Sequence, residues 1–305
     1  MTQDHLETFD GTVDHYLPSG RAKLVVRDYA HVEFDALDQH MSIHDSLYFR
    51  LGGTQPIQIN NEFYSERCLA VLSESISTRV STLGRQRFWV ISLSRGTMTR
   101  LLRLDARKEH GRFMSWDHIP WVDKLSRELC AAKSPEQLVE ISNQAVSLAM
   151  DRALDVTIVE PALYHVTAAK GDLSVADLAE KTSTNRRTLE RAFRARLGVS
   201  PNLEIRKTRF MTTVVQFLDN PGITWRDLEF APYVDQSHFL KEARFFNFKL
   251  RQMKAEEAMA SLYTRWFPEG EFEKDHAVSD PSKLPAVTKN FELRLQNLRN
   301  LAATC

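Results

Sequence analysis

Cysteine is scarce in this sequence of 305 residues. The three cysteines, Cys68, Cys130 and Cys305, lie far apart and form no Cys-x-x-Cys pair. This spacing argues against a disulfide framework and a structural zinc site, and it fits a reducing compartment. No apolar run approaches the roughly 18 residues of a membrane span, and the N-terminus lacks the apolar core of a secretory signal. We therefore expect a cytoplasmic protein with no membrane partner.

Common motifs of enzyme active sites are also missing. There is no Gly-x-Ser-x-Gly, no Walker loop and no Gly-x-Gly-x-x-Gly. His31 with Glu33, and His40 with His44, have spacings seen in strand-borne metal sites, but the full ligand arrangement is not present. Scattered surface or core histidines explain the pattern better. We predict no catalytic residues, no metal and no cofactor, while an enzymatic N-terminal domain is disfavoured rather than excluded.

Net charge is zero as well, with 40 basic and 40 acidic residues. The balance is not uniform along the chain, because residues 170–254 contain 16 Lys/Arg and 10 Asp/Glu, a local excess of +6. A basic block in a neutral chain indicates a module that faces a polyanion. Taken alone, a solvated basic face is the commoner explanation.

The first part of the chain is rich in β-branched and aromatic residues. Short runs of this kind, separated by polar or glycine-containing turns, predict a β-rich domain of sandwich or barrel type over residues 1–115. The runs are Ala22–Val26, His31–Phe34, Ser46–Leu51, Pro56–Ile59, Arg87–Leu93 and Leu101–Leu104. The aromatic side chains could line a ligand pocket, and packing in the core explains them equally well.

Helical patterns follow the β-rich segment. Val122–Ala132 and Ser134–Leu154 carry apolar residues at three- and four-residue spacing, which predicts a helical linker over residues 116–156. Ser134 is a candidate N-cap, Pro135 suits the first helical position, and Gln137 completes a capping box. These two helices could pair with a second subunit or pack on their own domain. Residues 253–305 read as a C-terminal helical extension.

Five arginines fall within eleven residues, from Arg186 to Arg196. On a helix from Asn185 to Leu197, one face carries Leu189, Phe193, Arg196 and Leu197. The opposite face carries Arg187, Glu190, Arg191 and Arg194. Asn185 is a favoured N-cap residue, and Gly198 is the residue favoured just after a helix end. The pattern predicts a capped helix with a basic outer face.

A shorter helix is predicted just before the arginine-rich one. Ser174 and Asp177 match a capping box, and a turn of about four residues separates the two helices. Such a pair is typical of a helix-turn-helix, whose second helix lies in the DNA major groove. Arginine can bond guanine O6 and N7 together, worth about 1–3 kcal/mol of discrimination. Because any helical hairpin can expose arginines, the periodicity alone leaves DNA binding open.

The segment from Leu173 to Pro201 resembles the first helix-turn-helix of the AraC/XylS family of transcription regulators. The matching positions are Leu178-Ala179, Asn185, Arg187, Leu189, Arg191, Phe193 and Gly198-Val199-Ser200-Pro201. Asn185 replaces the serine of the family pattern and keeps the capping chemistry. The resemblance implies an all-α DNA-binding domain over residues 157–252, about a third of the chain.

The resemblance also implies a second helix-turn-helix after a linking helix. Ser200–Gly222 reads as that linker, with Ser200 as cap and Pro201 first. Asp235–Phe239 resembles the start of a second recognition helix, with Gln236, Ser237, Leu240 and Lys241 outward and Phe239, Ala243 and Phe246 inward. The sequence departs from the family pattern at Leu228, Pro232-Tyr233, Ala243 and Phe248. We therefore treat this unit as degenerate and expect it to contact phosphate rather than read bases.

The sequence thus predicts an α+β protein with a β-rich N-terminal domain, a helical linker and an all-α C-terminal domain with two helix-turn-helix units. The predicted function is a sequence-specific DNA-binding transcription regulator, not an enzyme. Its expected partners are double-stranded DNA, a small-molecule effector bound by the N-terminal domain, RNA polymerase and a second copy of the chain. One rival is a small-molecule-binding protein or enzyme with a vestigial helix-turn-helix. Another is an architectural protein that binds DNA without sequence preference.

Each candidate residue has a predicted role at the DNA. Arg187, Glu190 and Arg191 are expected to face base edges. Phosphate contacts are expected from Arg186, Arg194, Lys241 and Arg244, which makes the affinity fall as salt rises. Asn185, Gln236, Ser237 and Leu240 complete the predicted DNA-contact set.

Overall fold

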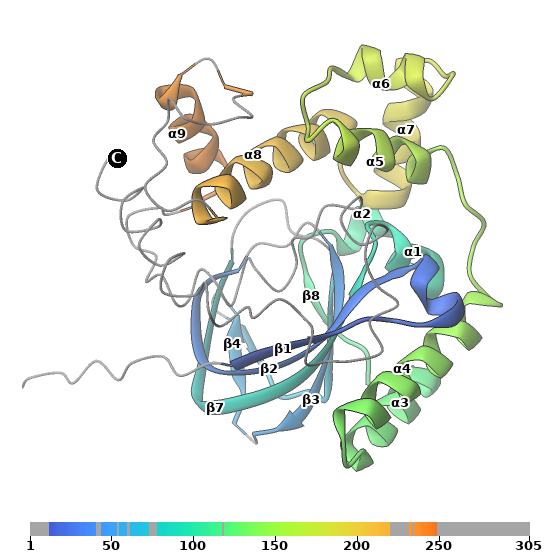
Figure 1. Cartoon of the computed structure of the whole chain (residues 1–305), viewed down its shortest axis with the longest axis vertical. Coiled ribbons are helices and arrows are strands. Elements are labelled where there is room, and N and C mark those ends of the chain that lie inside the picture. The colour runs from blue at the N-terminus through green and yellow to red at the C-terminus, as the bar shows by residue number, and fades with distance from the viewer. Residues whose placement is uncertain are drawn as a thin grey trace, which may run out of the picture.

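The N-terminal part of the chain is built on one antiparallel sheet (Figure 1). The computed structural model describes residues 12–40, 44–53, 55–59, 62–72, 78–117, 119–219, 232–233 and 235–248. Its eight strands are β1 (Thr12–Tyr16), β2 (Val26–His40), β3 (Asp45–Gly52), β4 (Ile57–Ile59), β5 (Glu62–Tyr64), β6 (Cys68–Val71), β7 (Thr78–Leu93) and β8 (Phe113–Ser115). They are ordered β1-β2-β7-β3-β6-β8, and β4 pairs with both β5 and β7. The predicted combination of a β-rich region and helices is confirmed.

The long strands β2 and β7 carry both hydrophobic faces of the sheet. Their pairing shifts register between Val26 and Asp28 and again between Phe34 and Ala36, and such bulges bend a strand and increase its twist. Alternate residues point to opposite faces. Trp89 and Ile91 belong to the core shared with the helices, while Phe88 and Val90 belong to a separate cluster on the other face, with Ala30, Val32, Ile57, Ile59, Leu69 and Val80.

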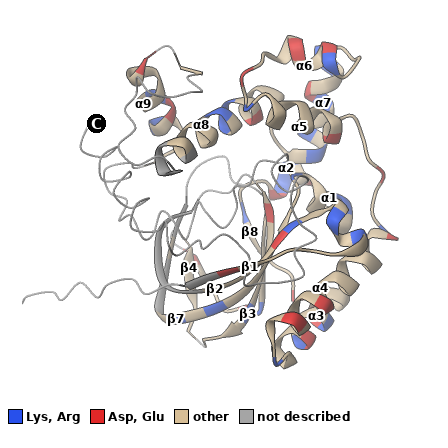
Figure 2. Cartoon of the chain, viewed as in Figure 1, with Lys and Arg blue, Asp and Glu red and all other residues tan. Residues whose placement is uncertain are grey.

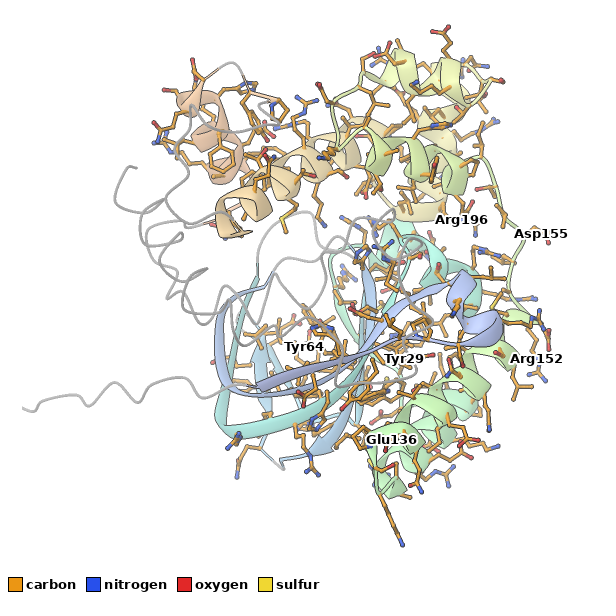
Figure 3. The ribbon with its side chains drawn as sticks, viewed as in Figure 1. Tyr29, Tyr64, Glu136, Arg152, Asp155 and Arg196 are labelled. Atoms are coloured by element: carbon orange, nitrogen blue, oxygen red, sulfur yellow. The ribbon has the colours of Figure 1, made fainter. Side chains whose placement is uncertain are left out.

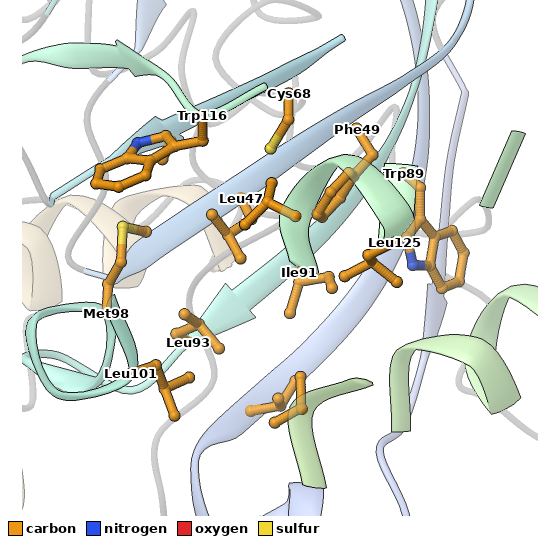
Figure 4. Packing of buried hydrophobic residues seen from close by; sticks show 14 of the residues in the cluster. Leu47, Phe49, Cys68, Trp89, Ile91, Leu93, Met98, Leu101, Trp116 and Leu125 are labelled. Atoms are coloured by element: carbon orange, nitrogen blue, oxygen red, sulfur yellow. The ribbon is translucent and has the colours of Figure 1, made fainter. Parts of the chain in front are cut away.

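Two helices cover one face of the sheet, α3 (Pro120–Ala131) and α4 (Pro135–Met150). Leu125 of α3 packs with Phe49 and Trp89 of the strands (Figure 4). The predicted cap of α4 is confirmed, since Ser134 Oγ accepts from Gln137 N. The predicted capping box does not form in its usual geometry, because Gln137 Oε1 accepts from the backbone N of Lys133 rather than from that of Ser134. The capping side chains therefore tie the turn between α3 and α4 to the start of α4.

The prediction of a strand at Ala22–Val26 was wrong for most of its length. Residues Gly20–Leu24 form the short 3₁₀ helix η1, and β2 begins only at Val26. Ala22 and Val25 are both buried three residues apart, whereas Leu24 is 74% exposed. That spacing places Ala22 and Val25 on one side of a helical turn. A short apolar run cannot by itself distinguish the two conformations.

The strand predicted at Leu101–Leu104 was also wrong. Leu101 and Leu102 end the helix α1 (Thr97–Leu102), which begins after Gly96. Gly96 has φ +80°, in the left-handed region that favours glycine, so the chain turns away from the end of β7. A further single-turn helix, α2 (Ala106–Glu109), follows with Asp105 as its N-cap. Leu101 is buried and Leu102 is half-buried on a helix that leaves the sheet.

Trp89 is the largest fully buried side chain of the core. Its ring stacks on Tyr29 at 5.8 Å between centroids, and its Nε1 donates to Ser142 Oγ of α4 at 2.8 Å. Replacing Ser142 by alanine leaves this buried N–H without its acceptor, so the free energy of unfolding is expected to fall by about 1–3 kcal/mol. Urea denaturation of the variant measures the loss. Ser147→Ala on the half-exposed side of α4 is the matched control, and an equal loss in both variants would contradict the prediction.

The C-terminal part of the described chain is helical. Its elements are α5 (Val159–Ala168), α6 (Val175–Lys181), α7 (Arg186–Leu197), α8 (Pro201–Asp219) and α9 (Gln236–Phe245). We call α5–α9 the helical part and β1–α4 the sheet part. The predicted C-terminal helical extension, residues 253–305, and the segment 220–231 before the second recognition helix lie outside the described residues. Among the described helices, none combines the length and the hydropathy needed to cross a membrane.

Candidate nucleic-acid interface

Helices α6 and α7 each begin at a side-chain cap. Ser174 N donates to Asp177 Oδ2 at 2.8 Å and Asp177 N donates to Ser174 Oγ at 3.2 Å, which is the predicted capping box. These hydrogen bonds hold the pKa of Asp177 below its usual value. Asn185 Oδ1 accepts from Thr188 N at 2.9 Å and begins α7, as predicted. Both helices therefore start at positions that the sequence fixes locally.

Helix α7 separates its apolar and basic faces. Leu189, Phe193 and Leu197 are fully buried in a cluster with residues of α5 and α6. The exposed face of the same helix carries Arg187, Arg191 and Arg194. These arginines are four and three residues apart, so their side chains follow one another along the helix surface. The predicted orientation of α7 is the observed one.

Two residues predicted to contact DNA bond to each other. Arg186 Nε lies 2.9 Å from Glu190 Oε1, an i,i+4 pair on the exposed side of α7. An exposed pair of this kind contributes about 0.3–0.5 kcal/mol, so water or phosphate can replace it at little cost. The pair nevertheless directs Glu190 toward the first turn of α7. Sequence analysis placed both residues at the surface but did not predict the bond.

Helix α9 has the same organisation as α7. Asp235 Oδ1 accepts from His238 N at 2.7 Å and caps the helix. Phe239, Ala243 and Phe246 are buried, as expected. The outward residues are exposed at Ser237, Lys241 and Arg244 and half-buried at Gln236 and Leu240. A second surface of mixed polar and basic residues therefore exists on α9.

An aromatic cluster accommodates two of the departures from the family pattern. Phe248, one of these departures, packs edge-on to Phe210 of α8 with 5.3 Å between ring centroids. Phe210 also stacks on Phe239 at 5.4 Å and on Phe246 at 5.0 Å. Tyr233 is buried against Phe239. Leu228, another of these departures, lies outside the described residues.

Helix α8 connects the two capped helices. Ser200 Oγ accepts from Leu203 N, so Ser200 caps α8 as predicted. With 19 residues the helix spans roughly 28 Å at 1.5 Å per residue. Near the start of α8, Arg206 Nη2 lies 2.8 Å from Glu242 Oε1 of α9, and the guanidinium stands 4.0 Å from the centre of the Phe245 ring. These contacts fix α9 on α8.

A buried charge cluster joins the helical part to the sheet part. Arg95, just after β7, lies 2.9 Å from Asp45 of β3 and 3.4 Å from Glu204 of α8. All three side chains are more than nine-tenths buried. Burial alone lowers the pKa of Arg95, but Glu204 and Asp45 outweigh that effect and raise it. The partners of Arg95 are 50 and 109 residues away in the chain, so no local pattern in the sequence predicts this cluster.

The C-terminal end of α7 lies directly against α1 and α2. Thr99 Oγ1 of α1 donates to the backbone oxygen of Arg196 at 2.9 Å. A Cβ placed on Gly198, which has φ +76°, would lie 2.3 Å from the backbone oxygen of Ala106. Glycine is therefore required at position 198 for two reasons. Its φ lies in the left-handed region, and α2 comes too close to leave room for a Cβ.

Arg196 joins α7 to the segment that follows α4. Its Nη2 donates to the backbone oxygen of Asp155 at 2.7 Å, and its Nε lies 3.1 Å from Glu160 Oε1 (Figure 3). From the sheet part, Arg103 Nη2 donates to the backbone oxygen of Arg152. The connecting segment is thus held from both sides. Arg196 is buried with the apolar face of α7, where the sequence had placed it.

Within the described residues, no group of three or more His, Cys, Asp or Glu side chains lies close enough to hold a metal ion. Cys68 is buried, and desolvation raises the pKa of its thiol well above the usual value.

The described fold is an α+β arrangement in which an antiparallel sheet with its covering helices contacts a helical part that presents a capped basic helix. Solved structures similar to the chain include two of ToxT from Vibrio cholerae. The fatty-acid-bound form is 11% identical with a TM-score of 0.45, covering 85% of this chain and 98% of that one. A second form is 14% identical with a TM-score of 0.42, covering 79% and 94%.

The AraC-like transcriptional activator CuxR is a further similar structure, with 15% identity and a TM-score of 0.22, covering 67% of this chain and 87% of that one. The AraC-like group is the one that the helix-turn-helix motif resembles. No protein-family model and no curated protein sequence matches the chain.

Proposed function

We propose that this chain is a sequence-specific DNA-binding transcription regulator in which α6 and α7 form a helix-turn-helix. The observation that carries the proposal is the exposed row Arg187, Arg191 and Arg194 on a helix that is capped and buried along its other face. A helix held in this way presents guanidinium groups at fixed spacing to a groove. Their planar donor sets match the guanine edge and the phosphate group.

Each residue of the predicted contact set has a role in the proposal. Arg187 and Arg191 read base edges, and Glu190 can accept from cytosine N4 once it leaves Arg186. Phosphate contacts come from Arg186, Arg194, Lys241 and Arg244. Asn185 orders the first turn of α7, where its side chain caps Thr188 N. Gln236, Ser237 and Leu240 line the α9 surface, which serves backbone contact rather than base reading.

The length of the linking helix α8 is compatible with a single subunit that makes two contacts on DNA. Helix α8 spans roughly 28 Å, and successive major grooves on one side of a duplex are about 34 Å apart. In this proposal the β-rich region, residues 1–115, is the effector-binding and dimerisation domain of a cytoplasmic homodimer that recruits RNA polymerase. Residues 116–156 form its helical linker, 157–252 the DNA-binding domain and 253–305 a C-terminal extension.

Selection of bound sequences from a random DNA pool tests this function most directly. A sequence-specific regulator is expected to enrich one motif. A protein or enzyme with a vestigial helix-turn-helix is expected to enrich none, and an architectural protein is expected to bind DNA without preference. The full chain should be used, because α7 contacts both α5 and α2.

Replacing Arg187 or Arg191 by alanine is expected to weaken binding to the selected motif by roughly 5- to 150-fold, since a bidentate base contact is worth about 1–3 kcal/mol. The preference at the contacted base should be lost as well. Equilibrium binding to the motif and to single-base variants of it measures both effects. Arg127→Ala on the exposed side of α3 is the control. Wild-type affinity and preference in both α7 variants would show that α7 does not read bases.

A further inference from the structure

A basic segment of the sheet part stands out from the charge of its surroundings. Residues 100–112 contain five Lys/Arg and two Asp/Glu, an excess of +3, whereas residues 1–99 contain nine Lys/Arg and twelve Asp/Glu, an excess of −3. The exposed cations of α2 and the residues just after it are Arg107, Lys108 and Arg112. We call these three residues the α2 cation group. The family resemblance does not extend to this segment, because it covers residues 157–252.

Not all cations of the basic segment are available for a partner. Arg100 Nε donates to the backbone oxygen of Leu154, and Arg103 Nη2 donates to the backbone oxygen of Arg152. Both arginines therefore hold the segment after α4. This use explains their presence without any external partner.

The α2 cation group has few competing partners within the described residues. Lys108 Nζ lies 3.9 Å from Asp105 Oδ2, a distance and exposure at which an ion pair contributes little. The side chains of Arg107 and Arg112 make no ion pair and no hydrogen bond with any described residue. Glu109, half-buried, is the other acid of α2. The group thus has three cations and two nearby carboxylates, Asp105 and Glu109, and the ion pair between Lys108 and Asp105 is weak.

The position of this group beside α7 gives it a specific context. The backbone of α2 touches the end of α7, since a Cβ on Gly198 would lie 2.3 Å from the Ala106 oxygen and 2.6 Å from His110 Cβ. The ion pair between Arg95 and Glu204 and the hydrogen bond from Thr99 Oγ1 to the Arg196 backbone oxygen also join the sheet part to the helical part. In Figure 2 the basic residues of α2 lie next to those at the lower end of α7. The two basic surfaces are therefore held together by a packed interface.

Arg194 and the α2 cation group lie close along the chain to the contact between α7 and α2. Arg194 precedes Gly198 by four residues, a rise of about 6 Å, and Arg107 and Lys108 directly follow Ala106 at the contact. A duplex carries one phosphate per about 3.4 Å of axis on each strand. A backbone that passes the C-terminal end of α7 would meet several phosphates within the reach of long Lys and Arg side chains.

We propose that Arg107, Lys108 and Arg112 bind the phosphate backbone of the DNA beside the groove that α7 enters, so that the sheet part contributes directly to DNA affinity. This inference rests on the proposed function, because α7 must lie on DNA to bring the backbone to α2. The contacts are ionic and independent of base sequence. They add affinity and a dependence on salt, and they leave the base preference to α7.

The test compares the full chain with the triple variant Arg107→Gln, Lys108→Gln and Arg112→Gln. The matched control removes three exposed cations from the end of the molecule that holds α3, through Lys124→Gln, Arg127→Gln and Lys133→Gln. Affinity for the motif selected by the wild type is measured over a series of salt concentrations. Each lost phosphate contact is expected to reduce the slope of log K against log salt by about 0.9, or about 2.7 for three. The control should keep the wild-type slope.

The outcomes separate this inference from the proposed function. If the wild type enriches no motif, the proposed function is wrong and the inference falls with it. If the wild type binds its motif and the α2 triple variant keeps the slope of the control, only the inference is wrong. Unchanged DNA binding with lost transcription in cells would overturn it in favour of an acidic protein partner. A changed base preference would also overturn it, while a reduced slope with unchanged preference and unchanged thermal unfolding supports it.

Discussion

Replacing Arg95 by alanine is expected to lower the free energy of unfolding by about 3–5 kcal/mol. The guanidinium pairs with Asp45 and Glu204, and all three side chains are buried between β3, the end of β7 and α8. Removing one member of a buried ionic cluster leaves the remaining charges desolvated without compensation, which accounts for a loss of this size. Denaturant unfolding followed by circular dichroism measures it.

Two further variants distinguish the buried cluster from an ordinary surface ion pair. Arg127→Ala breaks the exposed pair with Asp123 and should cost no more than about 0.5 kcal/mol. Combining Arg95→Ala with Glu204→Gln should cost less than the sum of the two single changes, because the neutral amide removes one of the carboxylates left uncompensated. Strict additivity, or a loss below about 1 kcal/mol for Arg95→Ala, would contradict the assignment.

In the proposed function, the Arg95 cluster also bears on DNA binding. Glu204 lies in the first turn of α8, directly after α7, and Thr99 holds the last turn of α7. Loss of the cluster should therefore loosen the position of α7 relative to the sheet part. If α2 assists α7 at the DNA, Arg95→Ala should reduce the salt dependence of binding, even where the folded protein remains the main species.

Replacing Gly198 by alanine is the second change with a large expected effect, a loss of about 3 kcal/mol in unfolding free energy. A residue with a side chain at φ +76° costs about 1–2 kcal/mol. The new Cβ would in addition lie 2.3 Å from the Ala106 oxygen, a backbone atom that cannot move without shifting α2. Overpacking of this kind adds about 1–3 kcal/mol.

Gly20→Ala is the matched control for the conformational part of this cost. Gly20 has φ +56°, also in the left-handed region, and a Cβ there would meet no atom within 4 Å. Thermal unfolding of the two variants gives the contribution of the contact between α7 and α2 as their difference. Equal losses in the two variants would mean that α7 and α2 are not packed against each other in solution.

The starts of α6, α7 and α9 could be predicted from the sequence because capping acts over three or four residues. Ser174, Asn185 and Asp235 each bond a backbone N–H three residues ahead, and this geometry needs nothing from the rest of the chain. The apolar spacing of Leu189, Phe193 and Leu197 likewise fixed which side of α7 would be buried. The outward arginines followed from that assignment.

Local sequence patterns gave wrong predictions where a short apolar run is compatible with both a strand and a helical turn. Ala22–Val26 and Leu101–Leu104 were predicted as strands, yet most of their residues lie in helical turns. Glycines with positive φ, Gly20 and Gly96, stand at the start of both turns. The positive φ follows from the path that the chain takes around the sheet, and the composition of a five-residue run carries no information on that path.

The sequence by itself determined the capped helices, the basic face of α7 and the division into a β-rich part and a helical part, because each depends on residues within one or two turns of each other. Only the tertiary structure decided that Arg95 meets Glu204 and that Ala106 meets Gly198. It also placed Phe248 against Phe210. All of these partners are tens of residues or more apart in the chain, so their contact depends on how whole elements pack rather than on local propensity.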